Sequence, residues 1–303
     1  MGASQRLTDG PVLVGVDGSA GARVAVDIGA WEAKWRHVPL LLVHGHQNPL
    51  PHTSSGVLPQ PAVAAMRDDM RAMLLETESR AHAQQPGVAV RSTLVTGGAG
   101  GLVEVSRGMS LVVVGSRGTG GFAGLHVGSV ASQVSMHSPA PVIVVRPGKD
   151  GSHARIGDGP VVVGLDGSQP SFDALGFAFE EANVRGVPLV PLYAWSQGPN
   201  ASSGYIGPIA QGPGRVREEI AQTLVEEFAA PWQEKYPDVR VTPIVRYQAP
   251  PAWALIEASR QAGLVVVGSR GRGGFAGLLL GSVGHAVASH AHCPVAVVRA
   301  AGD

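Results

Sequence analysis

The stretch Leu111-Val-Val-Val-Gly-Ser-Arg-Gly118, followed nine residues later by Gly128-Ser129, decides the fold of this chain. The apolar run Leu111–Val114 predicts a buried strand, and the residues after Gly128 have helical spacing. Between the two, glycines let the backbone approach a ligand closely, and the unpaired N–H groups of the helix start point at it. A strand, a glycine loop and a helix start together predict an anion site.

A second copy of this motif lies near the C-terminus. Leu264-Val-Val-Val-Gly-Ser-Arg-Gly271 is again followed by nine residues and then by Gly281-Ser282. Upstream, Val14-Gly-Val-Asp-Gly-Ser19 matches Val163-Gly-Leu-Asp-Gly-Ser168. Two copies of one motif predict two anion sites, and we expect each of them to bind a nucleotide.

The repeat also includes the ends of the two copies, where Pro141–Arg146 matches Pro294–Arg299. Each copy is close to 150 residues long, the usual size of one domain. We therefore predict one domain over residues 1–147 and a second over residues 160–303. The linker, residues 148–159, is rich in Gly, Asp, Lys and Ser and has no periodic apolar residues.

Composition favours a soluble globular protein. Hydrophobic residues make up 44% of the chain, enough for two cores, and the formal net charge is zero. A neutral chain offers no electrostatic argument for nucleic acid or an anionic membrane as a partner. No apolar run approaches the roughly 18 residues of a membrane helix, and residues 1–11 lack the apolar centre of a secretion signal. We expect a cytoplasmic protein without a nucleic-acid or membrane partner.

The single cysteine, Cys293, excludes an internal disulfide and fits a reducing compartment. Because it precedes Pro294 and an apolar run, we interpret it as a small buried hydrophobic residue. The eleven histidines show no metal-binding spacing such as H-E-x-x-H, and no protein-built metal site is predicted.

Short apolar runs alternate with segments of helical spacing in both copies, and Ser19 is expected to cap the first helix. The predicted strands are Val12–Val16, Leu40–His44, Val88–Val95, Leu111–Gly115 and Val142–Arg146, then Val161–Leu165, Leu189–Ala194, Val239–Val245, Leu264–Gly268 and Val295–Arg299. Continuous Val, Ile and Leu strands separated by helices predict a parallel sheet covered on both faces. The fold class is therefore α/β, with two doubly wound, Rossmann-like parallel sheets of five strands each.

In such a sheet a ligand lies beyond the carboxyl ends of the strands, where the winding reverses. If strands one and four of each copy are neighbours, Asp17 meets the loop Gly115–Gly128 there. Taken alone, Asp17 also fits a helix-capping or turn residue, but Asp166 at the equivalent place of the second copy favours a role in ligand binding. Arg117 and Arg270 either pair with phosphate or are solvated. The segments 47–61 and 196–214 are long for loops of a compact domain, so they are lids, partner surfaces or disordered surface.

The motif G-x2-G-x9-G-[S/T], present in both copies with Val-Gly-x-Asp-Gly-Ser and Pro-Val-x-Val-Val-Arg, resembles that of tandem universal stress proteins of the actinobacterial type. The resemblance covers both copies nearly end to end. It implies ATP binding in both domains, two nucleotides per chain, with Mg²⁺ on the phosphates. No Asp or Glu lies inside either glycine loop, so the metal is expected to be held mainly by phosphate, hydroxyl and water.

The resemblance assigns roles to particular positions. An acidic residue after strand one lies beside the adenosine, the backbone after strand two contacts adenine, and the glycine loop holds ribose and phosphate. The corresponding residues here are Asp17, Gly45, Gly115, Gly118, Gly128 and Ser129 in the first copy, and Asp166, Ala194, Gly268, Gly271, Gly281 and Ser282 in the second. At Gly118 and Gly271 a methyl group is expected to obstruct phosphate or to disfavour a positive φ. In the nine-residue spacer of the first copy, His126 stands at the position where the second copy has an apolar residue.

The resemblance favours a nucleotide-dependent regulator of stress or dormancy physiology that is not an enzyme. The alternative is a slow ATPase or phosphoryl-transfer enzyme, although neither copy has a Walker lysine or an acid with an assigned water-activating role. The fifth strand of each copy is expected at a sheet edge, where an exposed apolar strand needs a cover. We therefore expect the two domains to pair by their fifth strands about a pseudo-twofold axis, and the two-domain chain to form a homodimer.

Overall fold

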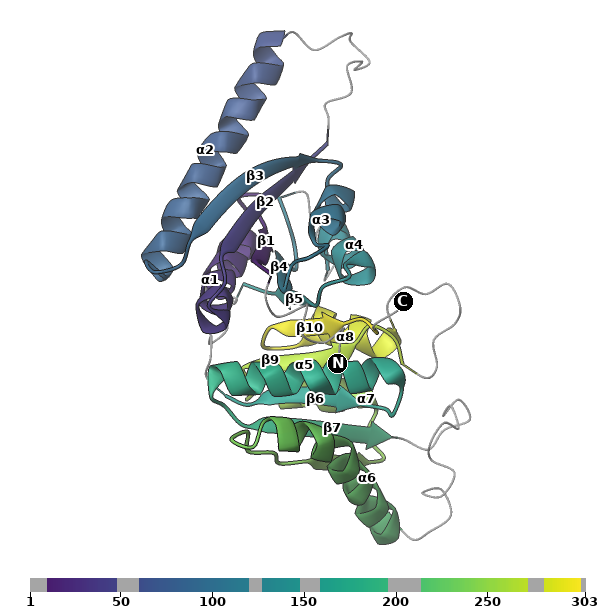
Figure 1. The fold of residues 1–303 in the computed structure, drawn as a ribbon. Coiled ribbons are helices and arrows are strands. Elements are labelled where there is room, and N and C mark those ends of the chain that lie inside the picture. Colours follow the sequence, from purple (N-terminus) through teal and green to yellow (C-terminus); the bar gives the residue numbers. More distant parts are fainter. Residues whose placement is uncertain are drawn as a thin grey trace. The chain divides into compact units, whose positions relative to one another are not determined.

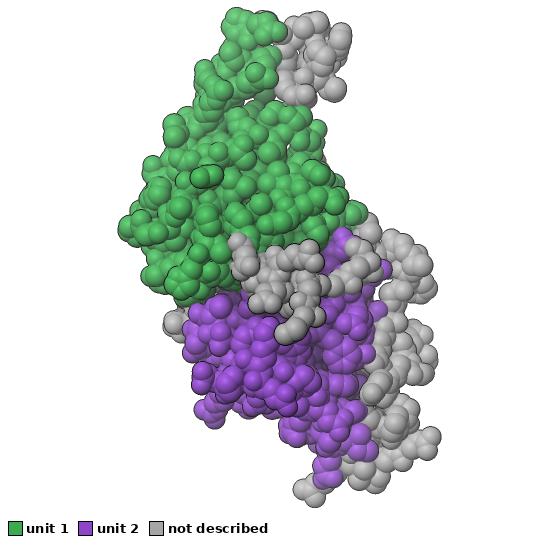
Figure 2. Space-filling view, viewed as in Figure 1, with its two compact units in different colours: residues 1–152 green, residues 153–303 purple. Residues whose placement is uncertain are grey.

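The computed structural model describes residues 10–47, 60–119, 127–147, 159–195, 214–271 and 281–300. The chain divides into two compact units, residues 1–152 and 153–303 (Figure 2). Each unit repeats the same alternation of strands and helices.

Unit 1 contains one parallel sheet in the order β3-β2-β1-β4-β5. Helices α1 and α2 lie on one side of this sheet and α3 and α4 on the other (Figure 1). The elements are β1 (Val12–Gly15), α1 (Ala20–Arg36), β2 (Leu40–His46), α2 (Gln60–Gln84), β3 (Val90–Thr96), α3 (Ala99–Val105), β4 (Leu111–Gly115), α4 (Ser129–His137) and β5 (Val142–Val145).

Unit 2 has the same strand order, β8-β7-β6-β9-β10, again all parallel. Its elements are β6 (Val161–Leu165), α5 (Gln169–Arg185), β7 (Leu189–Trp195), α6 (Gly214–Lys235), β8 (Ile244–Tyr247), α7 (Pro251–Ala258), β9 (Leu264–Gly268), α8 (Ser282–His290) and β10 (Val295–Val298). The predicted α/β class and parallel sheets are confirmed.

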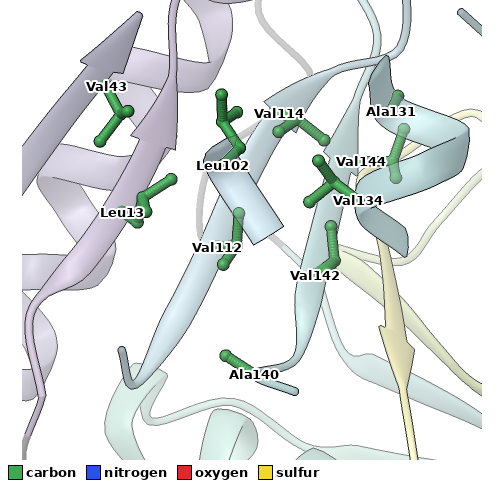
Figure 3. Close-up of a cluster of buried hydrophobic side chains, with 10 residues drawn as sticks. All are labelled: Leu13, Val43, Leu102, Val112, Val114, Ala131, Val134, Ala140, Val142 and Val144. Atoms are coloured by element: carbon green, nitrogen blue, oxygen red, sulfur yellow. The ribbon is translucent and has the colours of Figure 1, made fainter. Parts of the chain in front are cut away.

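The strands in the middle of each sheet are fully buried because helices cover both faces. In unit 1, side chains of β1, β4 and β5 pack against α3 and α4 in one apolar cluster, which Figure 3 shows. Leu102 of α3 and Val134 of α4 close this cluster on the helix side. The cluster holds the carboxyl ends of β1 and β4 side by side, at the place predicted for the ligand.

Helix ends follow the local signals of the sequence. Ser19 caps α1, as predicted, because its side-chain oxygen accepts a hydrogen bond from the N–H of Ala22 at 3.1 Å. Ser168 caps α5 in the same way through the N–H of Ser171. The strand prediction Val239–Val245 was wrong at its start: the regular ladder begins only at Ile244. An isolated β-bridge joins Val241 to Leu189 just before β8. Pro243 lies between this bridge and the regular ladder, and it has no N–H to donate to a neighbouring strand.

One buried ion pair joins α1 to α2 in unit 1. Both carboxylate oxygens of Asp27, which is 1% exposed, accept hydrogen bonds from Arg80, at 2.7 and 2.6 Å. In unit 2 the residue at the matching position of α5 is Gly176, where an added Cβ would collide with the ring of Trp232. The equivalent contact between helices is therefore an ion pair in unit 1 and the packing of a glycine against an aromatic ring in unit 2.

Cys293 is buried, as predicted, and burial raises the pKa of its thiol to about 12. Thiolate is the reactive form, so at pH 8 the folded protein should react with a disulfide reagent on the order of a thousand times more slowly than the denatured chain, whose thiol has a pKa of about 8.5. Stability gained from the protonated thiol should be lost as the pH rises from about 9 towards 12, because the unfolded chain ionises first. The absorbance of the thiol that the disulfide reagent releases measures the rate at which Cys293 reacts. Rapid labelling of Cys293 in the native protein would contradict the expectation.

Candidate nucleotide sites at the glycine loops

The described ends of the two glycine loops, residues 115–119 with 127–129 and residues 268–271 with 281–282, lie at the carboxyl ends of β4 and β9 and at the starts of α4 and α8. Strands β1 and β4 are neighbours, with Gly15 opposite Val114, so the residues that follow both strands meet at one edge of the sheet. The same holds for β6 and β9 in unit 2. Asp17 and Asp166 thus reach their respective glycine loops.

Asp17 bridges two loops through its carboxylate. Oδ1 accepts the N–H of Ser19 at 3.0 Å, and Oδ2 accepts the N–H of Thr119, 102 residues away, also at 3.0 Å. In unit 2, Asp166 Oδ1 accepts the N–H of Ser168 at 2.9 Å. The aspartate of each unit is therefore held by backbone N–H groups and faces the loop.

This contact explains the glycine that follows each arginine. A Cβ on Gly118 would collide with Asp17 Oδ2, and a Cβ on Gly271 would lie 2.6 Å from Asp166 Oδ2. The predicted alternative of a positive φ at Gly118 and Gly271 was wrong, since neither has one. The constraint is steric and comes from the aspartate.

In each loop, a backbone hydrogen bond between described residues joins the two sides of the nine-residue spacer. The N–H of Gly128 donates to the carbonyl of Ser116 at 2.6 Å, and the N–H of Gly281 donates to that of Ser269 at 2.8 Å. These bonds place Gly128 and Gly281 at the N-caps of α4 and α8, where no side chain caps the helix. Among the described residues, no side chain caps the first N–H groups of α4 and α8, from Ser129 and Ser282 onward, so these groups can bind a ligand or solvent.

Gly115 and Gly268 are glycines for a second reason. A Cβ on Gly115 would lie 2.7 Å from the carbonyl carbon of Gly21, and one on Gly268 would lie 2.9 Å from that of Pro170. Both clashes are with the first turn of the helix that follows the aspartate. These two positions allow that helix to pack closely on the end of the fourth strand.

The described residues contain no group of three or more His, Cys, Asp or Glu side chains able to hold a metal. Among the same residues, no helix has both the length and the apolar character of a membrane span. His126 of the first loop lies outside the described residues.

The sequence profile of the Universal stress protein family matches residues 10–146 and, again, residues 159–299. The chain belongs to the universal stress protein family. A universal stress protein of Mycobacterium tuberculosis is 37% identical over 295 residues, which cover 95% of this chain and 96% of that protein. One of Mycolicibacterium smegmatis is 36% identical over 304 residues, covering 97% and 99%.

A solved structure that spans the whole chain agrees on the fold. A universal stress protein of Archaeoglobus fulgidus is 18% identical, covers 98% of both chains and has a TM-score of 0.70. Another universal stress protein of that organism, solved in complex with dAMP, is 22% identical and covers 46% of this chain and 96% of its own, with a TM-score of 0.34.

Two residues that the family motif places after strand two lie inside strands instead. Gly45 belongs to β2, because β3 continues to pair with it up to His46 opposite Thr96. Ala194 belongs to β7 and lies opposite Arg246. A Cβ on Gly45 would be 2.5 Å from the carbonyl oxygen of Gly98, so this glycine lets α3 begin close to the strand.

Sequence reasoning missed two contacts of the first site. The hydroxyl of Ser19 donates to the carbonyl of Arg117 at 3.3 Å while it caps α1, which ties the loop to the helix. Arg146, directly after β5, lies near Arg117: burial and then the positive charge of Arg117 lower its pKa. Two neighbouring guanidinium groups favour an anion here. Long-range contacts of this kind leave no local pattern in the sequence.

Proposed function

We propose that this universal stress protein binds two adenine nucleotides, one at each glycine loop, and acts as a nucleotide-dependent regulator rather than as a catalyst. The observation that carries the proposal is the closed glycine loop that ends at an uncapped helix start, formed in both units. The doubled geometry supports phosphate binding, since backbone N–H groups and the helix dipole both favour an anion there. ATP is the ligand that the family resemblance implies.

Regulation without turnover is supported by the chemistry of the loops. Phosphoryl transfer needs groups that stabilise charge developing in the transition state and that orient the nucleophile. Asp17, the acid that lies against the first loop among the described residues, already accepts two backbone N–H groups. We therefore expect any ATP turnover to fall well below about 1 s⁻¹.

The donor set also fits Mg²⁺ bound together with a nucleotide. Mg²⁺ is usually held by one or two carboxylates, substrate phosphates and water. A carboxylate does lie against each glycine loop, although none lies within the loop sequence. Asp17 and Asp166 are the residues that would contact the ion. The ion would reduce the repulsion between the carboxylate and the negatively charged phosphates.

The central test is stoichiometry. Denaturation of purified protein and chromatography of the supernatant would identify any nucleotide carried from the cell. Calorimetric titration of nucleotide-free protein with ATP and Mg²⁺ should then fit two sites per chain. A fit to zero sites would refute the proposal. A fit to one site would show that one copy cannot bind the nucleotide even though its loop is closed.

We further propose that the protein is cytoplasmic and that the two-domain chain forms homodimers. Within their own sheets β5 and β10 come last in strand order, as the sequence predicted. Their pairing with each other stays a prediction. Sedimentation of the full chain measures the oligomeric state, and a monomer at micromolar concentration would contradict the dimer.

A further inference from the structure

We propose that Arg146 and the hydroxyl of Ser116 form a subsite for the outer phosphates of the nucleotide in unit 1, so that this site prefers a nucleoside triphosphate to a monophosphate. The inference rests on the proposed nucleotide binding and specifies which residues distinguish the number of phosphates. The glycine motif assigns no role to either side chain. Unit 2 repeats the pair as Ser269 and Arg299.

Ser116 and Arg146 lie side by side at the carboxyl ends of β4 and β5. The N–H of Ser116 donates to the carbonyl of Val145 at 2.7 Å, which places Ser116 beside Arg146. Side chains alternate between the two faces of a strand, so both residues share the face of Val114 and Val144, two positions earlier. That face packs against α3 and α4 (Figure 3). The two side chains therefore lie on the side of the sheet that α4 covers.

The hydroxyl of Ser116 is buried without a partner. Ser116 is 1% exposed, and its Oγ has no hydrogen-bond partner among the described residues; the same holds for Ser269 in unit 2. Native proteins leave few buried polar groups unpaired, because each one is unfavourable. The carbonyl of Ser116 accepts the N–H of Gly128 at 2.6 Å, so this hydroxyl belongs to the residue that holds the start of α4. A phosphate oxygen bound at that helix start would accept its proton.

Arg146 brings positive charge to the same place. Its side chain is partly buried, and burial followed by the positive charge of Arg117 lowers its pKa. No described carboxylate acts on Arg146 in the opposite direction. Two cations close together repel each other, and a ligand with several negative charges relieves that repulsion. Because the N–H groups of α4 can hold one phosphate by themselves, the arginines act on the second and third phosphates.

The experiment isolates the first site in the full chain. Gly281→Asp places a carboxylate at the N-cap of α8 to block the second site, and Arg146→Gln or Ser116→Ala is added to that background. Calorimetry in excess MgCl₂ measures the dissociation constants of ATP, AMP and inorganic triphosphate. Arg107→Gln is the matched control, since Arg107 is an exposed arginine of the same unit that pairs with Glu104 and lies just before β4, at the opposite edge of the sheet.

We expect the parent to bind ATP at least about tenfold more tightly than AMP, because hydrogen bonds to charged groups are strong. Arg146→Gln should weaken the binding of ATP and of triphosphate about tenfold or more, and that of AMP less than about threefold. Arg107→Gln should change none of them. Ser116→Ala should weaken ATP binding and leave the nucleotide-free protein as stable as before, because it removes a hydroxyl that has no partner.

An unchanged preference for ATP over AMP in Arg146→Gln would overturn the proposal, and so would an equal loss of both ligands. A loss seen with ATP but not with triphosphate would also overturn it, because Arg146 would then act on the nucleoside. Arg146→Lys, which keeps the charge, should retain most of the preference. Absence of nucleotide binding by the wild-type chain would instead overturn the proposed function itself. Arg299→Gln in a Gly128→Asp background repeats the test in unit 2.

Discussion

The substitution Gly128→Asp is expected to lower nucleotide affinity at the first site at least about 100-fold while leaving unit 1 as stable as before or slightly more stable. Gly128 has extended backbone angles, φ −74° and ψ 163°, which aspartate adopts readily at an N-cap. A Cβ there would lie 3.4 Å from the carbonyl oxygen of Ser116, an ordinary contact. The new carboxylate would accept the free N–H groups of α4 and take the place of phosphate.

The size of the effect follows from the bonds that are lost. Hydrogen bonds to a charged group contribute about 1.5–3 kcal/mol each, and two of them account for a factor of 100 or more. Replacing glycine by aspartate at the N-cap adds a few tenths of a kcal/mol of stability. A variant that is more stable and yet binds less cannot be explained by damage to the fold.

Calorimetry should show one nucleotide per chain for Gly128→Asp, one for Gly281→Asp and none for the double variant. Gly128→Asn, which caps the helix without a charge, should lose less affinity. Gly87→Ala is the control for glycine replacement, because a Cβ at Gly87 meets open space. Two full-strength sites in Gly128→Asp would show that the start of α4 is not the phosphate cradle.

Replacing Arg80 by methionine should lower the free energy of unfolding of unit 1 by about 3 kcal/mol or more. The change leaves the buried carboxylate of Asp27 without the bidentate partner that holds both its oxygens. Removal of one partner of a buried pair costs about 3–5 kcal/mol. We expect a loss at the lower end of this range, because the Arg80 side chain is 33% exposed and water can therefore reach the carboxylate.

Arg71→Met is the matched control on the same helix. Its pair with Asp68 is exposed, at 68% and 73% of the side chains, and its loss should change stability by less than about 0.5 kcal/mol. Urea unfolding of the full chain, followed by circular dichroism, measures both variants. The double change Asp27→Leu with Arg80→Met should recover most of the loss, since it removes the charge together with its partner. Equal stabilities for Arg80→Met and Arg71→Met would show that water replaces Arg80 at no cost.

Much of the fold follows from local patterns in this sequence. The apolar runs at Leu111–Gly115 and Leu264–Gly268 are strands with the predicted bounds, and the helices after Gly128 and Gly281 begin where the motif ends. The cap at Ser19 was also predictable, because the N–H group that an N-cap serine accepts lies only a few residues further along the chain. Patterns of this kind depend on neighbours along the chain.

Element ends and site contacts depended on partners far away in sequence. Gly45 lies in β2 because β3 extends its ladder to Thr96, and no signal near Gly45 shows that. Glycine favours neither strand nor helix by itself, so a long-range pairing decides its state.

The sequence by itself determined two α/β domains, their parallel strands and the loops that could approach an anion. Only the tertiary structure placed Asp17 against Gly118, closed the loop from Ser116 to Gly128 and joined Asp27 to Arg80, 53 residues away. The reason is physical. Hydrophobic periodicity and helix caps are recorded in adjacent residues, whereas strand register and packing between helices set which distant side chains meet.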